Sequence, residues 1–403
     1  MHLDLNSCFA SIEQQADPFL RAKPVAVAAY DSPGGCIIAP SVEAKRMGIK
    51  VGMRVKDGRL ICPQLIIKKP DPGKYRDVHL KLRKLLNDYT DGVVPKSIDE
   101  FVLDLEGAPA MRSRGIHDIA REIKARIKSE IGDWLRVSVG LGPNRFLAKT
   151  AAGLHKPDGL DEINIHNYRV IYAQLQLMDL CGIKKNNTIR LNNTGIFTVT
   201  DFFNASVEKL RRAFESINGW YWYLRIHGFE ADDVVFGRRS YGNSFALPKP
   251  FSTPQELAPI LAKLTEKTGF RMRRAGYFAR GVHLALLYRD WSYWHHGQTR
   301  PEPVFDSRDI YKIAFGILLH SPYRKPVRTL AVSCFNLEKK AVRQLTLLAD
   351  AEKKEKLVEA MDKITERWGQ FVITPALMLG THDLVPDRIA FGGAKELEEI
   401  ITD

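Results

Sequence analysis

Short apolar strand patterns alternate with basic helix patterns between residues 75 and 160, and this alternation limits the folds open to the chain. A basic helical stretch begins at Tyr75, a strand pattern surrounds Asp99, and a helix, a strand and another helix follow by residue 155. Such alternation favours a mixed α+β sheet covered by helices. The chain has 403 residues. It is therefore too long for one ordinary domain, and we expect roughly two to four units.

The stretch VPKSIDEFVLDL, residues 94–105, places two adjacent carboxylates, Asp99 and Glu100, in an apolar strand or hairpin. Asp and Glu are depleted in strands, and a buried carboxylate must be paired, protonated or bound to a metal. Asp4 lies in another strand pattern that could lie beside this pair. Together these side chains could hold two metal ions roughly 3.5 to 4 Å apart, as phosphoryl transfer requires. For an isolated Asp-Glu pair, a solvent-facing hairpin is the more common explanation.

The chain carries a net charge of +13, with 60 Lys and Arg residues against 47 Asp and Glu residues. This charge favours a polyanionic partner, with nucleic acid first and an anionic membrane second. No apolar run approaches the ~20 residues that span a bilayer, and the N-terminal residues lack the pattern of a secretion signal, so we expect a cytoplasmic protein. Five scattered cysteines without the spacing of a zinc site are expected to be reduced thiols.

Three segments resemble, in the same order, the motifs of Y-family, translesion DNA polymerases: DLNSCFASIEQ from Asp4, KSIDEFVLDL from Lys96 and SVGLGPNRFLAKTAAGLHKPDGL from Ser138. Several ordered motifs are far more specific than one. The resemblance implies an α+β, multidomain right-hand polymerase with a ferredoxin-like palm, small fingers, a helical thumb and an α+β little finger. The implied boundaries are 1–13 and 71–162 for the palm, 14–70 for the fingers, 163–237 for the thumb with a helix-hairpin-helix, 238–340 for the little finger, and 341–403 for a clamp-binding motif and tail.

The resemblance implies that Asp4, Asp99 and Glu100 are catalytic, and that they and the backbone carbonyl of Leu5 ligate two Mg²⁺ ions, with Mn²⁺ able to substitute. A divalent cation supplies the countercharge that makes a buried carboxylate pair tolerable. The resemblance also implies that Phe9 packs under the sugar of the incoming nucleotide and excludes a 2′-OH, although a lone Phe on a helix otherwise packs in a core. The resemblance further implies triphosphate contacts for Lys156 and Lys45, each of which could otherwise be a solvated surface lysine. Helix N-terminal amides of Asn6, Ser7, Cys8 and Phe9 could add a phosphate cradle.

Three positions depart from the family pattern: Val42 replaces a common tyrosine, Lys45 replaces the usual arginine, and Asn6 replaces a common second aspartate. Lysine lacks the bidentate fork of arginine. The sequences DLN and EAK resemble the catalytic subunit of polymerase V, whereas HKPDGL resembles polymerase IV. The branch within the family therefore stays open, and so does the strength of triphosphate binding.

Two further segments resemble contact sites for macromolecules. LCGIKKNNTIRLNNTGI, residues 180–196, resembles a helix-hairpin-helix, in which amides near Gly182 and Lys184 would hold a DNA phosphate. An ordinary glycine-terminated turn between helices is the alternative. RQLTLLAD, from Arg343, resembles a bacterial sliding-clamp motif, and the alternative is that its leucines begin a helix packed on the protein. The implied clamp-binding residues are Gln344, Leu345, Leu347 and Leu348.

The implied function is template-directed DNA synthesis by nucleotidyl transfer from a dNTP to a primer 3′-OH, with low fidelity and tolerance for damaged templates. The implied partners are primer-template DNA, dNTP, a sliding clamp and an accessory mutagenesis subunit, in the cytoplasm at the nucleoid and not at a membrane. A catalytically silent DNA-binding scaffold is the main alternative, and a two-metal nuclease is another. The presence of Asp4, Asp99 and Glu100 argues against the scaffold, and the nuclease has no candidate residue for positioning water.

Overall fold

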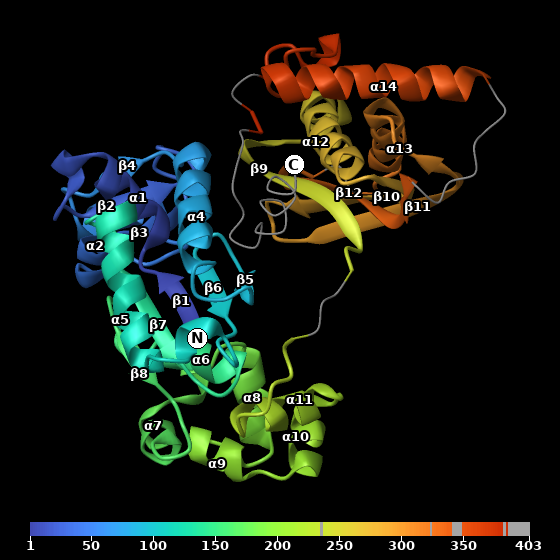
Figure 1. Ribbon diagram of the computed structural model, residues 1–403. Helices are drawn as coiled ribbons and strands as arrows, with labels where there is room; N and C mark the ends of the chain where they lie inside the picture. The colour runs from blue at the N-terminus through green and yellow to red at the C-terminus, as the bar shows by residue number, and fades with distance from the viewer. Residues whose placement is uncertain (234–236, 323–324, 341–348, 382–383, 386–403) are drawn as a thin grey trace. The chain divides into compact units, whose positions relative to one another are not determined.

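The computed structural model describes residues 1–233, 237–322, 325–340, 349–381 and 384–385 (Figure 1). The described residues up to 233 belong to one compact unit, and those from 237 onward belong to a second. Both units combine β-sheet with helices, so the α+β class predicted from the sequence is confirmed. No helix within the described ranges has the length and apolar character needed to cross a membrane.

The first unit is built around a five-stranded sheet in the order β5-β6-β1-β7-β8. Its strands are β1 (His2–Leu5), β5 (Val93–Pro95), β6 (Glu100–Leu103), β7 (Val137–Leu141) and β8 (Leu160–Glu162). β1 lies between β6 and β7 and is antiparallel to both. Because side chains alternate along a strand, Leu3 and Leu5 enter the core, while His2 and Asp4 face the opposite side of the sheet.

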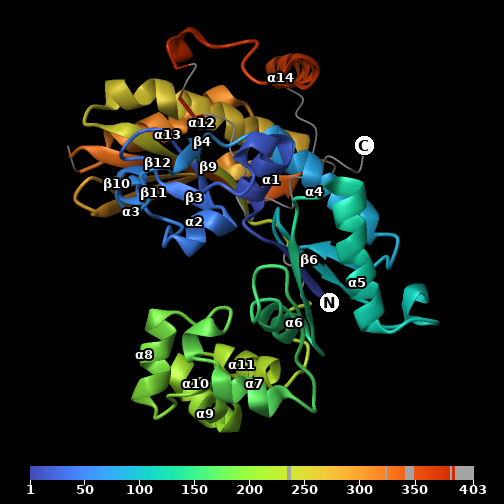
Figure 2. The same ribbon diagram turned by 90° about the vertical axis from the view of Figure 1, so that its left-hand side faces the viewer.

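The leucine face of this sheet is covered by α1 (Cys8–Ala16), α4 (Pro72–Leu86) and α5 (Ile116–Arg126). α4 begins after Asp71, whose carboxylate accepts hydrogen bonds from the amides of Gly73 and Lys74. A π-helical turn, Ile127–Ile131, extends α5. α6 (Arg145–Ala151) packs near β1 and β7, and Figure 2 shows α5 and α6 on either side of β6. The sheet face that carries Asp4 is therefore bordered by α6.

A smaller sheet follows α1 in the chain, in the order β3-β2-β4, and has its own apolar core. Its strands are β2 (Val25–Ala28), β3 (Ile37–Pro40) and β4 (Ile66–Lys68), and its helices are α2 (Val42–Arg46) and α3 (Val55–Ile61). The hydroxyl of Ser41 accepts hydrogen bonds from the amides of Ala44 and Val25, both at 3.2 Å. Ser41 therefore caps α2 and fixes the start of this helix against β2.

A helical segment follows β8 and completes the first unit. It contains α7 (Tyr168–Gln174), α8 (Lys185–Asn193), α9 (Val199–Asn204), α10 (Val207–Phe214) and α11 (Asn218–Ile226). Its core is rich in aromatic rings: Trp222 contacts Phe202, Phe214 and also Phe146 of α6. Short 3₁₀ turns in the described chain lie at Pro18–Leu20, Pro109–Met111, Leu177–Asp179 and Ala376–Met378.

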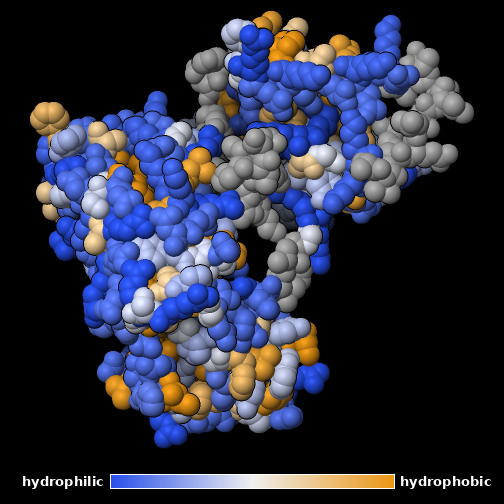
Figure 3. All heavy atoms as spheres, viewed as in Figure 1, coloured by the Kyte–Doolittle hydropathy of each residue, from blue (hydrophilic) through white to orange (hydrophobic). Residues whose placement is uncertain are grey.

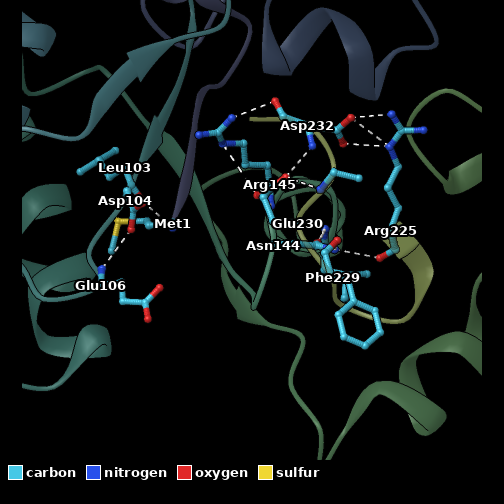
Figure 4. A network of polar contacts seen from close by, with 12 residues as sticks. Met1, Leu103, Asp104, Glu106, Asn144, Arg145, Arg225, Phe229, Glu230 and Asp232 are labelled. Atoms are coloured by element: carbon cyan, nitrogen blue, oxygen red, sulfur yellow. Dashed lines mark hydrogen bonds and ion pairs between the residues drawn. The ribbon is translucent and has the colours of Figure 1, made fainter. Parts of the chain in front are cut away.

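The chain that leaves this helical segment is hydrogen-bonded to the start of α6 (Figure 4). The side-chain amide of Asn144 donates to the carbonyl oxygens of Arg225 and Phe229, both at 2.9 Å. The backbone amide of Arg145 donates to the carboxylate of Glu230 at 3.0 Å. These bonds fix the N-terminus of α6, the helix that borders the Asp4 face of the sheet.

The second unit contains a four-stranded antiparallel sheet in the order β11-β10-β12-β9. Figure 1 shows α12 and α13 on one face of this sheet and α14 across these helices. Arg273 holds α14 through two hydrogen bonds to the carboxylate of Asp362, both at 2.7 Å. The elements are β9 (Ser240–Phe251), α12 (Pro254–Arg274), β10 (Tyr277–Tyr288), β11 (Tyr293–Val304), α13 (Ser307–Leu319), β12 (Val327–Lys339) and α14 (Ala349–Trp368).

Candidate active site

The stretch around Asp99 forms a hairpin, one of the two structures that its sequence allows. β5 ends at Pro95 and β6 begins at Glu100. Asp99 lies in the turn, where the hydroxyl of Ser97 donates to its carboxylate at 2.5 Å. The amide of Leu5 donates to the carbonyl oxygen of Asp99 at 2.9 Å. The turn is therefore attached to the end of β1, the strand that carries Asp4.

Asp4 and Glu100 are direct cross-strand neighbours in the antiparallel pair of β1 and β6. Side chains directly opposite each other in such a pair lie on the same face of the sheet. Together with His2 they form a group whose potential ligand atoms all lie within 4.8 Å of one another. The carboxylate of Asp99 lies in the turn and outside this group. The structure thus brings together two predicted ligands and adds an imidazole to them.

Two ammonium groups balance the charge of these carboxylates. Nζ of Lys149, on α6, lies 2.8 and 2.6 Å from the two carboxylate oxygens of Glu100. Nζ of Lys156 lies 2.7 Å from Oδ2 of Asp4. The side chains of Glu100 and Asp4 are only 18% and 16% exposed. Because charges removed from water need a partner, the two lysines make this acidic pair tolerable.

The environment of Asp99 disfavours its charged form. Burial raises the pKa of Asp99 to about 6, and the negative charges of Asp4 and Glu100 act in the same direction. The hydrogen bond from Ser97 stabilises the carboxylate and partly opposes this rise. Crowding of carboxylates in a buried position is a typical property of sites that bind cations or transfer protons.

His2 is a member of this site that the sequence interpretation missed. It is 1% exposed. Burial lowers the pKa of His2 to about 3, and the positive charges of Lys149 and Lys156 act in the same direction. One signal could have found it: His2 precedes Asp4 by two positions in a strand pattern, and residues two apart on a strand share a face.

A pocket of about 350 Å³ opens beside Asp4. Three cationic side chains line it, Lys45, Arg46 and Lys156, so the pocket suits an anionic ligand. Burial lowers the pKa of Lys45, and the charge of Lys156 adds to this effect. Arg46 was not predicted, although it adjoins Lys45 at the end of α2. The remaining lining residues are Asn6, Ser7, Val42 and Pro157.

Asn6 connects the end of β1 to the loop that carries Lys156. Its side-chain oxygen accepts a hydrogen bond from the amide of Asp158 at 2.7 Å. Its side-chain nitrogen donates to the hydroxyl of Ser138, on β7, at 3.0 Å. Asn6 is 5% exposed. These bonds favour a role in holding the Lys156 loop at the pocket.

Ser7 lines the same pocket and caps α1, whose first residue is Cys8. Ser7 has a left-handed backbone, with φ 51°, and among the described residues its buried hydroxyl has no hydrogen-bond partner. Non-glycine residues in this conformation are uncommon and cluster at functional sites. Burial raises the pKa of the Cys8 thiol, so this side chain is neutral. Its backbone amide, in the first turn of α1, has no acceptor within the helix.

Phe9 lies in the core of the five-stranded sheet. It is 2% exposed, and its ring stacks on that of Tyr75 with the centroids 4.3 Å apart. Phe9 follows the pocket residue Ser7 by two positions in the chain. Its proposed contact with the sugar of a nucleotide stays a prediction.

The segment predicted to be a helix-hairpin-helix has a tight turn at Gly182. Its φ is +91°, and a Cβ atom there would lie 3.1 Å from the ring of Trp222, so a side chain is disfavoured. Lys184 is exposed at the N-terminal cap of α8. Figure 3 shows apolar residues at the surface of the helical segment. Phe197 and Ile217 of this segment are 65% and 53% exposed. Phosphate binding at this turn stays a prediction.

The predicted clamp-binding residues, Gln344, Leu345, Leu347 and Leu348, lie outside the described residues. α14 begins directly after them, at Ala349. Both interpretations of this segment, a clamp-binding motif and a packed helix, therefore stay predictions.

Comparison with known proteins relates this chain to a family. Residues 3–153 match the model of the impB/mucB/samB family, and residues 238–347 match that of its C-terminal domain. A relative in Pelotomaculum thermopropionicum, named DNA polymerase IV, is 33% identical over 391 residues, which cover 96% of each chain. DNA polymerase IV 1 of Bacillus subtilis is 31% identical over 92% of this chain and 91% of its own length. A solved Y-family DNA polymerase chimera of Dbh and Dpo4 has a TM-score of 0.73 at 22% identity, and covers 83% of this chain and 98% of its own.

The chain belongs to the impB/mucB/samB family, the Y-family of DNA polymerases, and is a DNA-directed DNA polymerase. The resemblance that was inferred from three sequence motifs is therefore confirmed, and so is the predicted multidomain α+β polymerase fold. The curated relatives described above carry the name DNA polymerase IV, the branch that the sequence HKPDGL resembles.

Proposed function

We propose that this protein copies damaged templates with low fidelity, by transferring a nucleotide from a dNTP to the 3′-OH of a DNA primer. The observation that carries this proposal is the cross-strand pair of Asp4 and Glu100, which lies beside a cationic pocket of about 350 Å³. Curated relatives named DNA polymerase IV support the reaction. The sequence has no motif that resembles a proofreading exonuclease, so fidelity would rest on this one site.

The donor set fits divalent cations. Carboxylate and carbonyl oxygens are the ligands that Mg²⁺ prefers. The ammonium groups of Lys149 and Lys156 pair with Glu100 and Asp4, so these carboxylates already have positive charge beside them. Asp4, Asp99, Glu100 and the carbonyl of Leu5 would hold two Mg²⁺ ions, with Mn²⁺ able to substitute. When bound, such ions supply charge stabilisation to the attacking and leaving oxygens of the reaction.

The cationic pocket would bind the triphosphate. Lys45, Arg46 and Lys156 line it, and Asn6 fixes the loop that carries Lys156. Backbone amides at the start of α1, from Asn6 to Phe9, would add hydrogen bonds to phosphate oxygens. Phe9 would then lie under the sugar and exclude a 2′-OH by its bulk. Lys45 makes a weaker contact than an arginine would, because it lacks the bidentate fork.

The partners would be primer-template DNA, dNTP and a bacterial sliding clamp. Two similar structures are titled as an insertion ternary complex and a post-insertion binary complex of Dbh DNA polymerase, which supports the first two. Gly182 and Lys184 would hold a DNA phosphate, and Gln344, Leu345, Leu347 and Leu348 would bind the clamp. An accessory mutagenesis subunit is a further proposed partner, and the chain would act in the cytoplasm at the nucleoid.

Primer extension with Mg²⁺ and dNTPs tests the reaction. The parent protein extends the primer, whereas Glu100→Gln loses at least about 100-fold in rate because it removes one negative charge from the site. Primer-template affinity of this variant stays within about threefold, because phosphate contacts elsewhere dominate affinity. Asp133→Asn is the control, since Asp133 is 67% exposed and pairs with Arg21. A parent protein that binds DNA without extending the primer would instead support the silent scaffold.

A further inference from the structure

His2 is a buried polar side chain without a visible role. It is 1% exposed, and among the described residues neither of its ring nitrogens has a hydrogen-bond partner. Buried polar atoms in folded proteins nearly always have a partner, so an exception needs an explanation. Leaving such a group unpaired destabilises a fold. A functional partner that binds at this position would remove that cost.

The geometry of β1 directs the imidazole toward the catalytic carboxylates. His2 and Asp4 are two apart on one strand and share a face, and Glu100 lies opposite Asp4 on β6. The ligand atoms of these three side chains all lie within 4.8 Å of one another. Two ligand atoms on opposite sides of an ion, each at roughly 2.1 Å, lie about 4.2 Å apart. A small side-chain adjustment therefore brings all three to one cation.

His79 provides an internal comparison. It is also 1% exposed, but its Nδ1 contacts the carbonyl oxygen of Ile98 at 2.9 Å. Its ring stacks on Phe101 with the centroids 4.8 Å apart. The fold therefore satisfies one ring nitrogen of His79 and leaves only its Nε2 without a partner among the described residues, whereas both nitrogens of His2 lack one.

We propose that His2 is a further ligand at the metal site, and that it makes the site favour a first-row transition ion such as Mn²⁺ over Mg²⁺. The inference rests on the proposed function, which places divalent cations at Asp4 and Glu100. Imidazole nitrogen binds divalent transition ions readily, while Mg²⁺ prefers oxygen ligands. A site with two carboxylates and one imidazole therefore discriminates between these ions more than an all-oxygen site does.

A spectroscopic test needs no variant. Electron spin echo envelope modulation of Mn²⁺ bound to the full chain, without DNA or nucleotide, detects directly bonded nitrogen. We expect a ¹⁴N coupling from imidazole in the parent protein, its loss in His2→Phe, and its retention in His79→Phe. A parent protein with bound Mn²⁺ and no ¹⁴N coupling would overturn the proposal, whatever the variants do.

Binding affinities give a second, independent test. Titration of the full chain with Mn²⁺ and with Mg²⁺ should show that His2→Phe weakens Mn²⁺ binding about tenfold or more and Mg²⁺ binding much less. An unchanged ratio of the two affinities would mean that His2 is not a ligand, while the proposed function would stand. If Asp4→Asn and Glu100→Gln leave Mn²⁺ binding unchanged, the ion binds elsewhere, and the metal site of the proposed function fails together with this inference.

Discussion

The ammonium group of Lys149 lies 2.8 and 2.6 Å from the two carboxylate oxygens of Glu100, and so joins α6 to the first residue of β6. Burial alone would lower the pKa of Lys149, but the hydrogen bond and the charge of Glu100 outweigh it and raise this pKa. The lysine is therefore charged at neutral pH. It supplies positive charge at a carboxylate that the proposed mechanism assigns to a metal ion.

Metal removal should therefore stop primer extension without unfolding the protein. With EDTA, we expect the unfolding temperature of the parent protein to stay within about 2 °C of its value in Mg²⁺, because Lys149 and Lys156 keep the carboxylates paired. Lys149→Met leaves the largely buried carboxylate of Glu100 without this partner, and should lose about 1 to 3 kcal/mol of stability in EDTA. Added Mg²⁺ should recover more stability in this variant than in the parent.

Thermal unfolding in EDTA and in Mg²⁺ measures both effects. Lys81→Met is a matched control, because Lys81 is 55% exposed and forms a surface ion pair with Asp77. Surface pairs of this kind contribute little, so the control should behave as the parent does. An equal Mg²⁺ effect in Lys149→Met and Lys81→Met would contradict the assigned role of Lys149.

Replacement of Phe9 by a smaller residue should admit ribonucleotides. We expect the ratio of kcat/KM for a dNTP over its rNTP to fall at least about tenfold in Phe9→Val, because the clash with a 2′-OH is relieved; tenfold corresponds to about 1.4 kcal/mol in the transition state. The same change weakens stacking on Tyr75, so it also destabilises the core. Single-nucleotide kinetics measures the ratio.

Phe202→Val separates the proposed exclusion of ribonucleotides by Phe9 from this loss of stability. Phe202 is 0% exposed and lies in the core of the helical segment, so its replacement also creates a cavity. Its dNTP to rNTP ratio should match that of the parent. If Phe9→Val and Phe202→Val discriminate equally well against the rNTP, Phe9 is only a core residue.

Local sequence patterns predicted the acidic pair because the relevant geometry is local. The period of two along β1 places Asp4 on the face opposite Leu3 and Leu5, and the Asp-Glu pair falls at the start of the next paired strand. Motif order then favoured a catalytic role for this pair, which the dipeptide alone could not do, and that role stays a prediction. The mixed sheet was predicted for the same reason, since strand and helix periods differ clearly between residues 75 and 160.

The partners of these carboxylates could not be predicted, because they depend on contacts between distant residues. Lys149 is one of 60 Lys and Arg residues, and nothing in its helix pattern indicates that it faces Glu100. The bond from Asp158 to Asn6 joins residues 152 positions apart. Asn6 was interpreted as a departure from an aspartate, whereas the structure gives it a bond that orients the Lys156 loop. Such roles follow from tertiary packing alone.

Lys184→Ala tests DNA binding by the turn at Gly182. If Lys184 neutralises one phosphate, the slope of log affinity for primer-template DNA against log salt should decrease by about 0.9. Arg121→Ala is the control, since Arg121 is 65% exposed on α5 and pairs with Asp118. Fluorescence anisotropy at several salt concentrations measures the slope. Identical slopes for the parent and Lys184→Ala would mean that the side chain of Lys184 does not neutralise a DNA phosphate.

The last prediction concerns the predicted clamp-binding residues, which immediately precede α14. A peptide of this kind anchors two apolar side chains in a pocket while a glutamine hydrogen-bonds at the rim, and the tether raises the effective concentration of a polymerase at the primer end. Replacing Gln344, Leu347 and Leu348 with alanine should therefore abolish stimulation by a loaded cognate clamp and leave clamp-independent extension unchanged. If these leucines instead pack on the protein, the triple variant should lose several kcal/mol of stability and be stimulated by the clamp as strongly as the parent.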